Sequence, residues 1–257
     1  KSKGNVMYAD DLASVFGVDA VRYFVLHEMP YADDGIITWE LMCERINSDL
    51  ANTLGNLLKR TVSMTNQYLG GVAKNTGVCG DTDGDLKNVI SAACRKVACK
   101  MDEYKVADAL DALWTVFRRA NKYIDETAPW ILAKTEGKRD RLSEVLFNLL
   151  YALDTGANLL KAFMPKTAER IFAEIGAKSR QLNLLGKNIY TPEYTVINAP
   201  ETLFERIKYE DIKPMIEKIE SAQIAESASS EEEKKAQITI DDFAKIELRV
   251  GLVTACE

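Results

Sequence analysis

Residues 39–71, WELMCERINSDLANTLGNLLKRTVSMTNQYLGG, have the pattern of one long amphipathic helix. Apolar residues recur at intervals of three and four, which places them on a single helical face. The run ends at Gly70 and Gly71, and glycine is a common stop for a helix. We therefore expect the following apolar side chains to lie in a core: Trp39, Met42, Ile46, Leu50, Leu54 and Leu57.

Three further stretches repeat this pattern after a polar loop that is rich in Gly, Asp and Thr. Apolar stripes run through residues 86–104, 107–124 and 142–160, and a shorter helix is expected over 167–175. Trp114 falls on one of these stripes, so we expect it, like Trp39, in the core. Long amphipathic helices with connections of this kind predict a mainly α protein built on an antiparallel helical bundle.

The segments on either side of the bundle have a different character. Residues 1–38 read as short mixed elements, with two helical patterns, a turn at Asp34 and Gly35 and a brief β-branched run, which predicts a short α/β connector. Residues 177–215 are irregular and partly extended, and 216–240 are rich in Ser, Ala and Glu, as in a linker or a solvated helix. The last stretch, 241–257, alternates apolar and polar residues like a strand. The bundle itself is assigned to 39–176.

Composition excludes several classes of protein. Among 257 residues, 47% hydrophobic, there is no apolar run long enough to span a bilayer and no signal-peptide pattern, so we expect a cytosolic protein without membrane contact. The five cysteines have no Cys-x-x-Cys spacing, which argues against disulfides and a zinc site.

The charge is unevenly distributed. Of 33 basic and 39 acidic residues, 8 and 14 lie beyond residue 200, so the first 200 residues carry 25 of each and the tail supplies the net charge of −6. A neutral body permits a local RNA-binding face but argues against nonspecific coating of nucleic acid.

RINSDLANTLGNLLKRT (45–61) resembles the first bundle helix of methionyl-tRNA synthetases, and NKYIDETAPWILAK (121–134) resembles the junction after their third. ETLFERI (201–207) resembles the segment that returns toward the core, although Glu205 stands where we expect proline. DFAKIELRVG (242–251) resembles the start of an appended tRNA-binding domain of the OB-fold type.

The opening residues, KSKGNV, resemble the end of the Lys-Met-Ser-Lys-Ser loop of class I aminoacyl-tRNA synthetases. Lys1 and Ser2 would be its last two positions, as a remnant of a catalytic loop whose lysine meets the charge that develops on pyrophosphate. The resemblance thus implies that both ends are cuts, and that residues 1–38 include a connector that contacts the tRNA stem. It also implies that 241–257 begin a truncated OB-fold.

The resemblance further implies a parent enzyme that uses ATP and Mg²⁺ to activate methionine and transfers it to tRNA(Met). The nucleotide-binding sheet, a His-x-Gly-His loop and any zinc would lie in a missing N-terminal part, so we expect this chain to be inactive in catalysis and to bind no cofactor itself. Its expected partners are tRNA(Met), the catalytic domain of the same chain and, through the truncated C-terminal domain, a second copy.

Asn52, Asn56 and Arg60 follow one another at intervals of four, which places them in a row beside the apolar stripe. Amide and guanidinium groups can read unstacked bases, but from the residues alone a plain polar flank is the favoured interpretation. Pro129 is well placed to begin a helix, with Trp130 next to it. The resemblance assigns all five residues to binding of the methionine anticodon, with Trp130 as a stacking surface.

Two alternatives remain open. The chain could be a freestanding helical RNA-binding or assembly module that never had a catalytic part. It could also be the anticodon-binding domain of another class I synthetase, specific for valine, leucine, isoleucine or cysteine, although these should lack the LANTLGN and TAPW stretches and the terminal β module.

Overall fold

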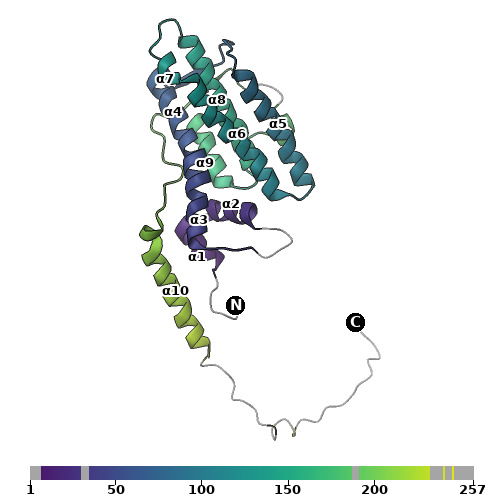
Figure 1. The fold of residues 1–257 in the computed structure, drawn as a ribbon, viewed down its shortest axis with the longest axis vertical. Helices are drawn as coiled ribbons and strands as arrows, with labels where there is room; N and C mark the ends of the chain where they lie inside the picture. Colours follow the sequence, from purple (N-terminus) through teal and green to yellow (C-terminus); the bar gives the residue numbers. More distant parts are fainter. Residues whose placement is uncertain (1–6, 30–34, 187–190, 232–239, 241–244, 246–257) are drawn as a thin grey trace, which may run out of the picture.

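The computed structural model describes residues 7–29, 35–186, 191–231, 240 and 245, and it is mainly α-helical (Figure 1). Below the bundle in this view lie two short helices, α1 (Ala9–Phe16) and α2 (Val18–Glu28). Gly17 joins them at φ +82°, a backbone conformation that glycine adopts without steric penalty. The apolar faces of these helices, including Phe16 and Phe24, join the main core.

We call α1 and α2 the base of the molecule. One long helical rod connects this base to the opposite end. It consists of α3 (Trp39–Arg45), a π-helical segment η1 (Ile46–Gly55) and α4 (Asn56–Leu69). The rod ends where Gly70 takes the left-handed conformation, with φ +68°, and its N–H returns to the last turn. The prediction of a long helix ending at the glycine pair is therefore confirmed.

The π-helical segment was not predicted. Its hydrogen bonds reach back five residues, as in the bond from the Asn56 N–H to the Ala51 carbonyl. The Thr53 hydroxyl likewise donates to the Ser48 carbonyl, five residues earlier, at 2.9 Å. Residues five apart, as well as residues four apart, therefore lie on the same side of this part of the rod.

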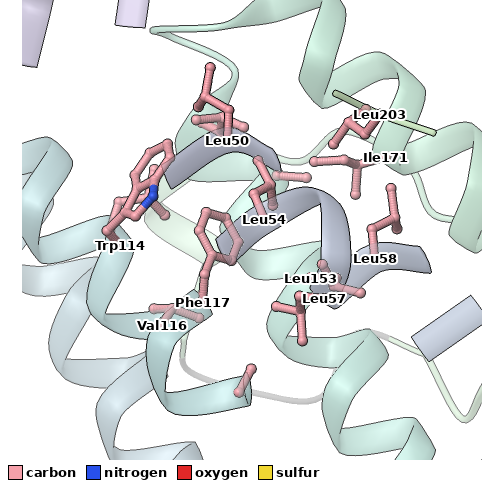
Figure 2. Packing of buried hydrophobic residues seen from close by; sticks show 14 of the residues in the cluster. Leu50, Leu54, Leu57, Leu58, Trp114, Val116, Phe117, Leu153, Ile171 and Leu203 are labelled. Carbon is pink, nitrogen blue, oxygen red and sulfur yellow. The ribbon is translucent and has the colours of Figure 1, made fainter. Parts of the chain in front are cut away.

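The remaining helices of the bundle are α5 (Asp83–Asp102), α6 (Val106–Thr127), α8 (Arg139–Leu160) and α9 (Pro165–Ile175), with the short α7 (Pro129–Leu132) between α6 and α8. Figure 2 shows leucines of the rod packed against side chains of α6, α8 and α9. Trp39 and Trp114 are 8% and 1% exposed, so their expected place in the core is confirmed.

A two-stranded antiparallel sheet and an extended segment bring the chain back along the rod. β1 (Val72–Lys74) pairs with β2 (Glu193–Thr195), and Ala73 lies opposite Tyr194. A short 3-10 turn, η2 (Leu182–Leu184), precedes β2. After β2 the chain passes α4 and α9, and then α10 (Tyr209–Glu231) begins near the base, where Ile216 is buried against the core (Figure 1).

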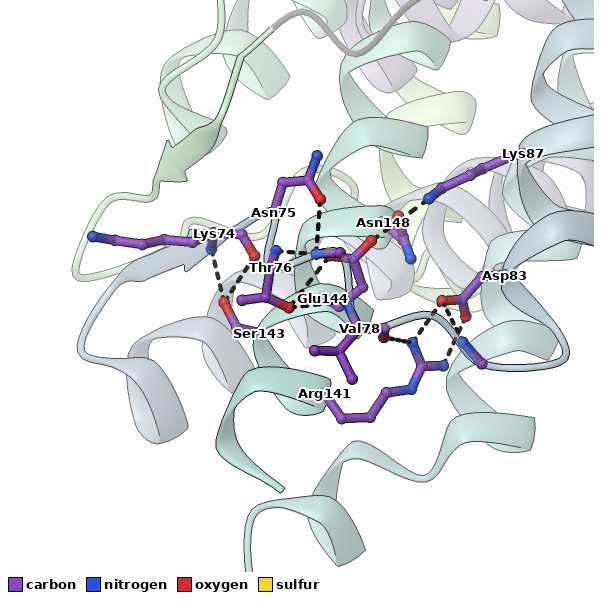
Figure 3. Close-up of polar contacts among 12 residues, drawn as sticks. Lys74, Asn75, Thr76, Val78, Asp83, Lys87, Arg141, Ser143, Glu144 and Asn148 are labelled. Carbon is purple, nitrogen blue, oxygen red and sulfur yellow. Dashed lines mark hydrogen bonds and ion pairs between the residues drawn. The ribbon is translucent and has the colours of Figure 1, made fainter. Parts of the chain in front are cut away.

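Buried polar contacts fasten the loop between β1 and α5 to α8 (Figure 3). The fully buried carboxylate of Glu144 accepts the backbone N–H groups of Thr76 and Gly77 at 2.8 and 3.0 Å. Arg141 donates to both carboxylate oxygens of Asp83 at 2.6 and 2.7 Å. Because a buried carboxylate is stable only when its hydrogen bonds are made, these contacts fix the loop in one position.

Some predicted segments differ from the structure, and others lie outside the described residues. The β-branched run after Gly35 pairs with no strand, and the described residues of the connector contain helices alone, so the two strands of the described chain lie elsewhere. Part of the expected linker is helical, because α10 extends to Glu231. Lys1, Ser2 and the strand pattern of 241–257 lie outside the described residues, apart from Lys245. None of the described helices is long and apolar enough to cross a membrane.

The first turn of the rod offers a test of its local stability. The Thr38 hydroxyl accepts the Leu41 N–H at 3.1 Å, as an N-cap. We expect Thr38→Ala to lower the free energy of unfolding by about 1 kcal/mol, measured by urea denaturation. Thr38→Ser keeps the hydroxyl and should lose much less, so equal losses in the two variants would contradict the capping role.

Candidate nucleic-acid interface

A sharp break between α6 and α7 sets the position of Trp130. The break occurs at Ala128, which has the left-handed φ and ψ of +43° and +64°. A residue with a Cβ pays about 1–2 kcal/mol for this conformation, so the surrounding structure must hold it there. Pro129 then begins α7 with its ring buried, while Trp130 stays 38% exposed. Strained backbone of this kind concentrates at ligand-binding sites.

An open cavity of about 450 Å³ lies between α4 and α7. The structure brings three of the predicted site residues, Asn56, Arg60 and Trp130, together in its wall. Pro129, which precedes Trp130, is buried and is not part of the cavity wall. The cavity is lined by Asn56, Lys59, Arg60, Ser63, Met64, Tyr68 and Trp130.

The lining combines the groups that a single-stranded nucleic acid requires. Trp130 offers an aromatic surface and Asn56 an exposed amide. Arg60 makes one long ion pair with Asp125, at 3.4 Å, and Asp125 is itself 69% exposed. Exposed pairs of this kind contribute little, so the guanidinium can exchange this partner for a base or a phosphate. Stacking surface, amide and cation thus face one space.

Asn52 lies in a second, smaller cavity of about 240 Å³ beside the first. Asn56 and Lys59 line both cavities, so the two lie next to each other along the rod, and together they are called the groove below. The far wall of the second cavity is the extended return segment at Thr202 and 204–206. Gly55 also lines this cavity, and a Cβ there would stand 3.1 Å from the Leu50 carbonyl oxygen, a tight contact within the rod, and 3.8 Å from the Phe204 backbone, an ordinary one.

Asn52 and Arg60 line different cavities. Asn52 belongs to η1, whereas Asn56 and Arg60 belong to α4. The expected row with intervals of four assumed regular α geometry throughout, whereas Asn52 lies in a π-helical segment and contacts the return segment. There its Oδ1 accepts hydrogen bonds from Nε and Nη2 of Arg206 at 2.9 and 2.5 Å.

Sequence reasoning missed part of this groove. Lys59 follows Asn56 by three residues, and Ser63, Met64 and Tyr68 follow Arg60 by three, four and eight, so a helical-face count from Asn56 and Arg60 would have included them. Arg206 carries no such signal, because it is 154 residues from Asn52 in the chain. In the part of the chain that the structure describes, no group of three or more His, Cys, Asp or Glu residues could hold a metal ion.

Family comparisons agree with this arrangement. A model described as the anticodon binding domain of methionyl tRNA ligase matches residues 73–223, and a model described as tRNA synthetases class I (M) matches residues 1–62. The methionine–tRNA ligases of Clostridium tetani and Bacillus subtilis are 42% and 37% identical to the whole chain. The chain spans about 40% of the length of each of these relatives.

Solved structures give the same result. The apo methionyl-tRNA synthetase of Mycobacterium tuberculosis superposes on 79% of this chain with a TM-score of 0.71 at 31% identity. The same synthetase bound by methionyl-adenylate superposes on 80% with a TM-score of 0.73 at 32% identity. In both cases the match takes in 41% of the longer chain. With more than half of its residues in one family model, this chain belongs to the methionyl-tRNA synthetase family.

Proposed function

We propose that this chain binds the anticodon loop of tRNA(Met) in the groove between α4, α7 and the return segment. The observation that carries the proposal is the single cavity that contains Trp130, Asn56 and Arg60. An unpaired anticodon base stacks on Trp130, while the amide and the guanidinium bind its polar edge or the adjacent phosphate. Pro129 holds the tryptophan in place, and Asn52 reads a neighbouring base from the second cavity.

Charge supports a specific mode of binding. The groove carries Lys59, Arg60 and Arg206, whereas the first 200 residues of the chain are neutral overall. Binding driven by phosphate contacts alone requires many such cations and falls steeply with salt. With few cations in the groove, the affinity must depend on stacking and on hydrogen bonds to base edges.

The activity of the longer protein is part of the same proposal. Because the relatives are methionine–tRNA ligases of which this chain spans about 40%, we assign it to an enzyme that activates methionine with ATP and transfers it to tRNA(Met). The chain has one histidine and therefore contains no His-x-Gly-His motif. We attribute the ATP chemistry, with Mg²⁺ and any zinc, to the region of the relatives that this chain does not span, and we assign Lys1 and Ser2 to its mobile ATP loop. We also propose that the longer protein dimerises through the OB-fold module that includes residues 241–257.

Fluorescence anisotropy with an anticodon stem-loop of tRNA(Met) tests the binding proposal. We expect the 257-residue chain to bind this loop, and each single change of an anticodon base to weaken binding by about a factor of ten, which corresponds to roughly 1.4 kcal/mol. A loop with the same stem and a scrambled anticodon is the control. Equal affinity for all loops would overturn the assignment, and it would favour a general RNA-binding module.

A further inference from the structure

We infer that Arg206, on the return segment, is a positioning residue that sets the direction in which Asn52 reads RNA. Nε and Nη2 of Arg206 both donate to Oδ1 of Asn52, at 2.9 and 2.5 Å. The inference rests on the proposed function, since it concerns the same groove. It adds that base recognition by the rod depends on a side chain from a distant part of the chain.

The contact determines which end of the amide faces the RNA. The oxygen and nitrogen of an asparagine amide are ordinarily hard to tell apart, and the assignment follows from the partners. Arginine has five N–H donors and no acceptor, so the amide atom facing Arg206 must be the oxygen. Two donors occupy both lone pairs of that oxygen. Asn52 is therefore left with its two Nδ2 hydrogens, and it can recognise only acceptor atoms on a base.

The return segment is itself held firmly enough to fix Arg206. Next to Arg206, the Ile207 N–H donates to Oδ1 of Asn47 at 2.8 Å, and Nδ2 of Asn47 donates to the Ile207 carbonyl at 2.7 Å. On the other side, Arg170 of α9 donates to the carbonyls of Leu203 and Thr202 at 3.0 Å each. The backbone around Arg206 thus has fixed contacts to both η1 and α9.

The π-helical turns create the opportunity for this contact. Asn47 and Asn52 are five residues apart, so in a segment with bonds from i to i+5 they lie on the same side of the rod. One asparagine binds the backbone of the return segment, and the other binds its arginine. In a regular α-helix the same two residues would point in different directions.

Two substitutions test separately the Nδ2 donor of Asn52 and the positioning of Asn52 by Arg206. Asn52→Asp keeps an oxygen for Arg206 and replaces the Nδ2 donor by a second acceptor. Arg206→Met keeps much of the side-chain length and removes the donors, which leaves Asn52 free to rotate. Lys208→Met is the matched control, because it removes the same charge from an exposed position two residues further on.

The measurement is the anisotropy affinity of the 257-residue chain for the cognate stem-loop and for three loops that each carry one changed anticodon base. Discrimination is the ratio of the affinity for the cognate loop to that for a loop with one changed base. At one anticodon position, we expect Asn52→Asp to reduce this ratio about tenfold, because a donor is replaced by a repelling acceptor. Arg206→Met should reduce it roughly two- to tenfold, since Asn52 must then be ordered during binding. Lys208→Met should keep the wild-type discrimination.

A double substitution identifies how Arg206 acts. If Arg206 works through Asn52, adding Arg206→Met to Asn52→Ala causes no further loss of discrimination. If Arg206→Met instead lowers the affinity for all four loops equally, also when it is added to Asn52→Ala, and the salt dependence becomes shallower, Arg206 binds a phosphate and the inference is wrong. A wild-type chain that discriminates, with an Arg206→Met variant that discriminates equally, also overturns it while leaving the proposed function intact. A wild-type chain that fails to discriminate overturns both.

Discussion

Replacement of Arg180 by methionine is expected to lower the free energy of unfolding by about 3–5 kcal/mol. Nη1 of Arg180 donates to both carboxylate oxygens of Asp154 at 2.7 Å, and Asp154 is fully buried in α8. The same carboxylate accepts the Tyr194 hydroxyl at 2.8 Å and Nδ2 of Asn158 at 3.0 Å. Without the guanidinium, the carboxylate keeps its neutral partners but loses its counter-charge, which is strongly unfavourable in the interior.

The loss should depend on pH in a defined direction. Burial raises the pKa of Asp154 above its ordinary value of 3.8, while Tyr194, Arg180 and Asn158 oppose the rise. A carboxyl group with a raised pKa binds more protons when folded, so its contribution to stability falls as the pH rises from about 3.8 through the folded pKa. Removing Arg180 raises that pKa further. Urea denaturation should therefore show a larger loss at pH 7 than at pH 5.

Two controls distinguish the buried charge from a general packing defect. Arg118→Met removes an exposed arginine from α6 and should change stability by less than about 0.5 kcal/mol. Adding Asp154→Asn to Arg180→Met removes the unpaired charge and should restore part of the loss. A double variant as unstable as Arg180→Met alone, or a loss that is independent of pH, would contradict this explanation.

The position of Asp154 illustrates what the sequence could and could not predict. The apolar stripe through 142–160 predicted that α8 would be a bundle helix, because the spacing of leucines is a local property of the chain. The same spacing does not reveal that Asp154 is wholly buried, since its partners Arg180 and Tyr194 reach it only in the folded structure. Burial of a charge depends on contacts distant in sequence, and periodicity does not record them.

The candidate site was predictable to a similar extent. Asn56, Arg60 and Trp130, singled out from the sequence with the help of the resemblance, line one cavity. Their role in RNA binding stays a prediction. Helical spacing could reveal neither that ten residues of the rod are π-helical nor that Asn52 contacts Arg206, 154 residues away in the chain. A Cβ at Gly55 would stand only 3.1 Å from the Leu50 carbonyl oxygen, which gives a physical reason for a glycine at the end of that segment, but a glycine within a helical pattern does not by itself indicate π geometry.

Trp130→Ala is expected to weaken binding of the tRNA(Met) anticodon stem-loop by about 1–3 kcal/mol, which is the value of stacking one base on an aromatic ring. At constant salt this corresponds to a factor of roughly 5–150 in the dissociation constant. The ring is 38% exposed at the mouth of the cavity, and the strained turn at Ala128 and the buried Pro129 hold it there before RNA arrives. The stacking surface is therefore ordered in advance, and little entropy is lost on binding.

The neighbouring residue provides the control for this substitution. Ile131 lies on the same short helix and is 58% exposed, but it is absent from the cavity wall. Ile131→Ala should therefore bind the stem-loop like the wild type, with a similar melting temperature. Trp130→Phe keeps an aromatic face of smaller area, so its affinity should fall between those of the wild type and Trp130→Ala. If Trp130→Ala and Ile131→Ala bind equally well, Trp130 does not stack on a base, and the anticodon must lie elsewhere on the rod.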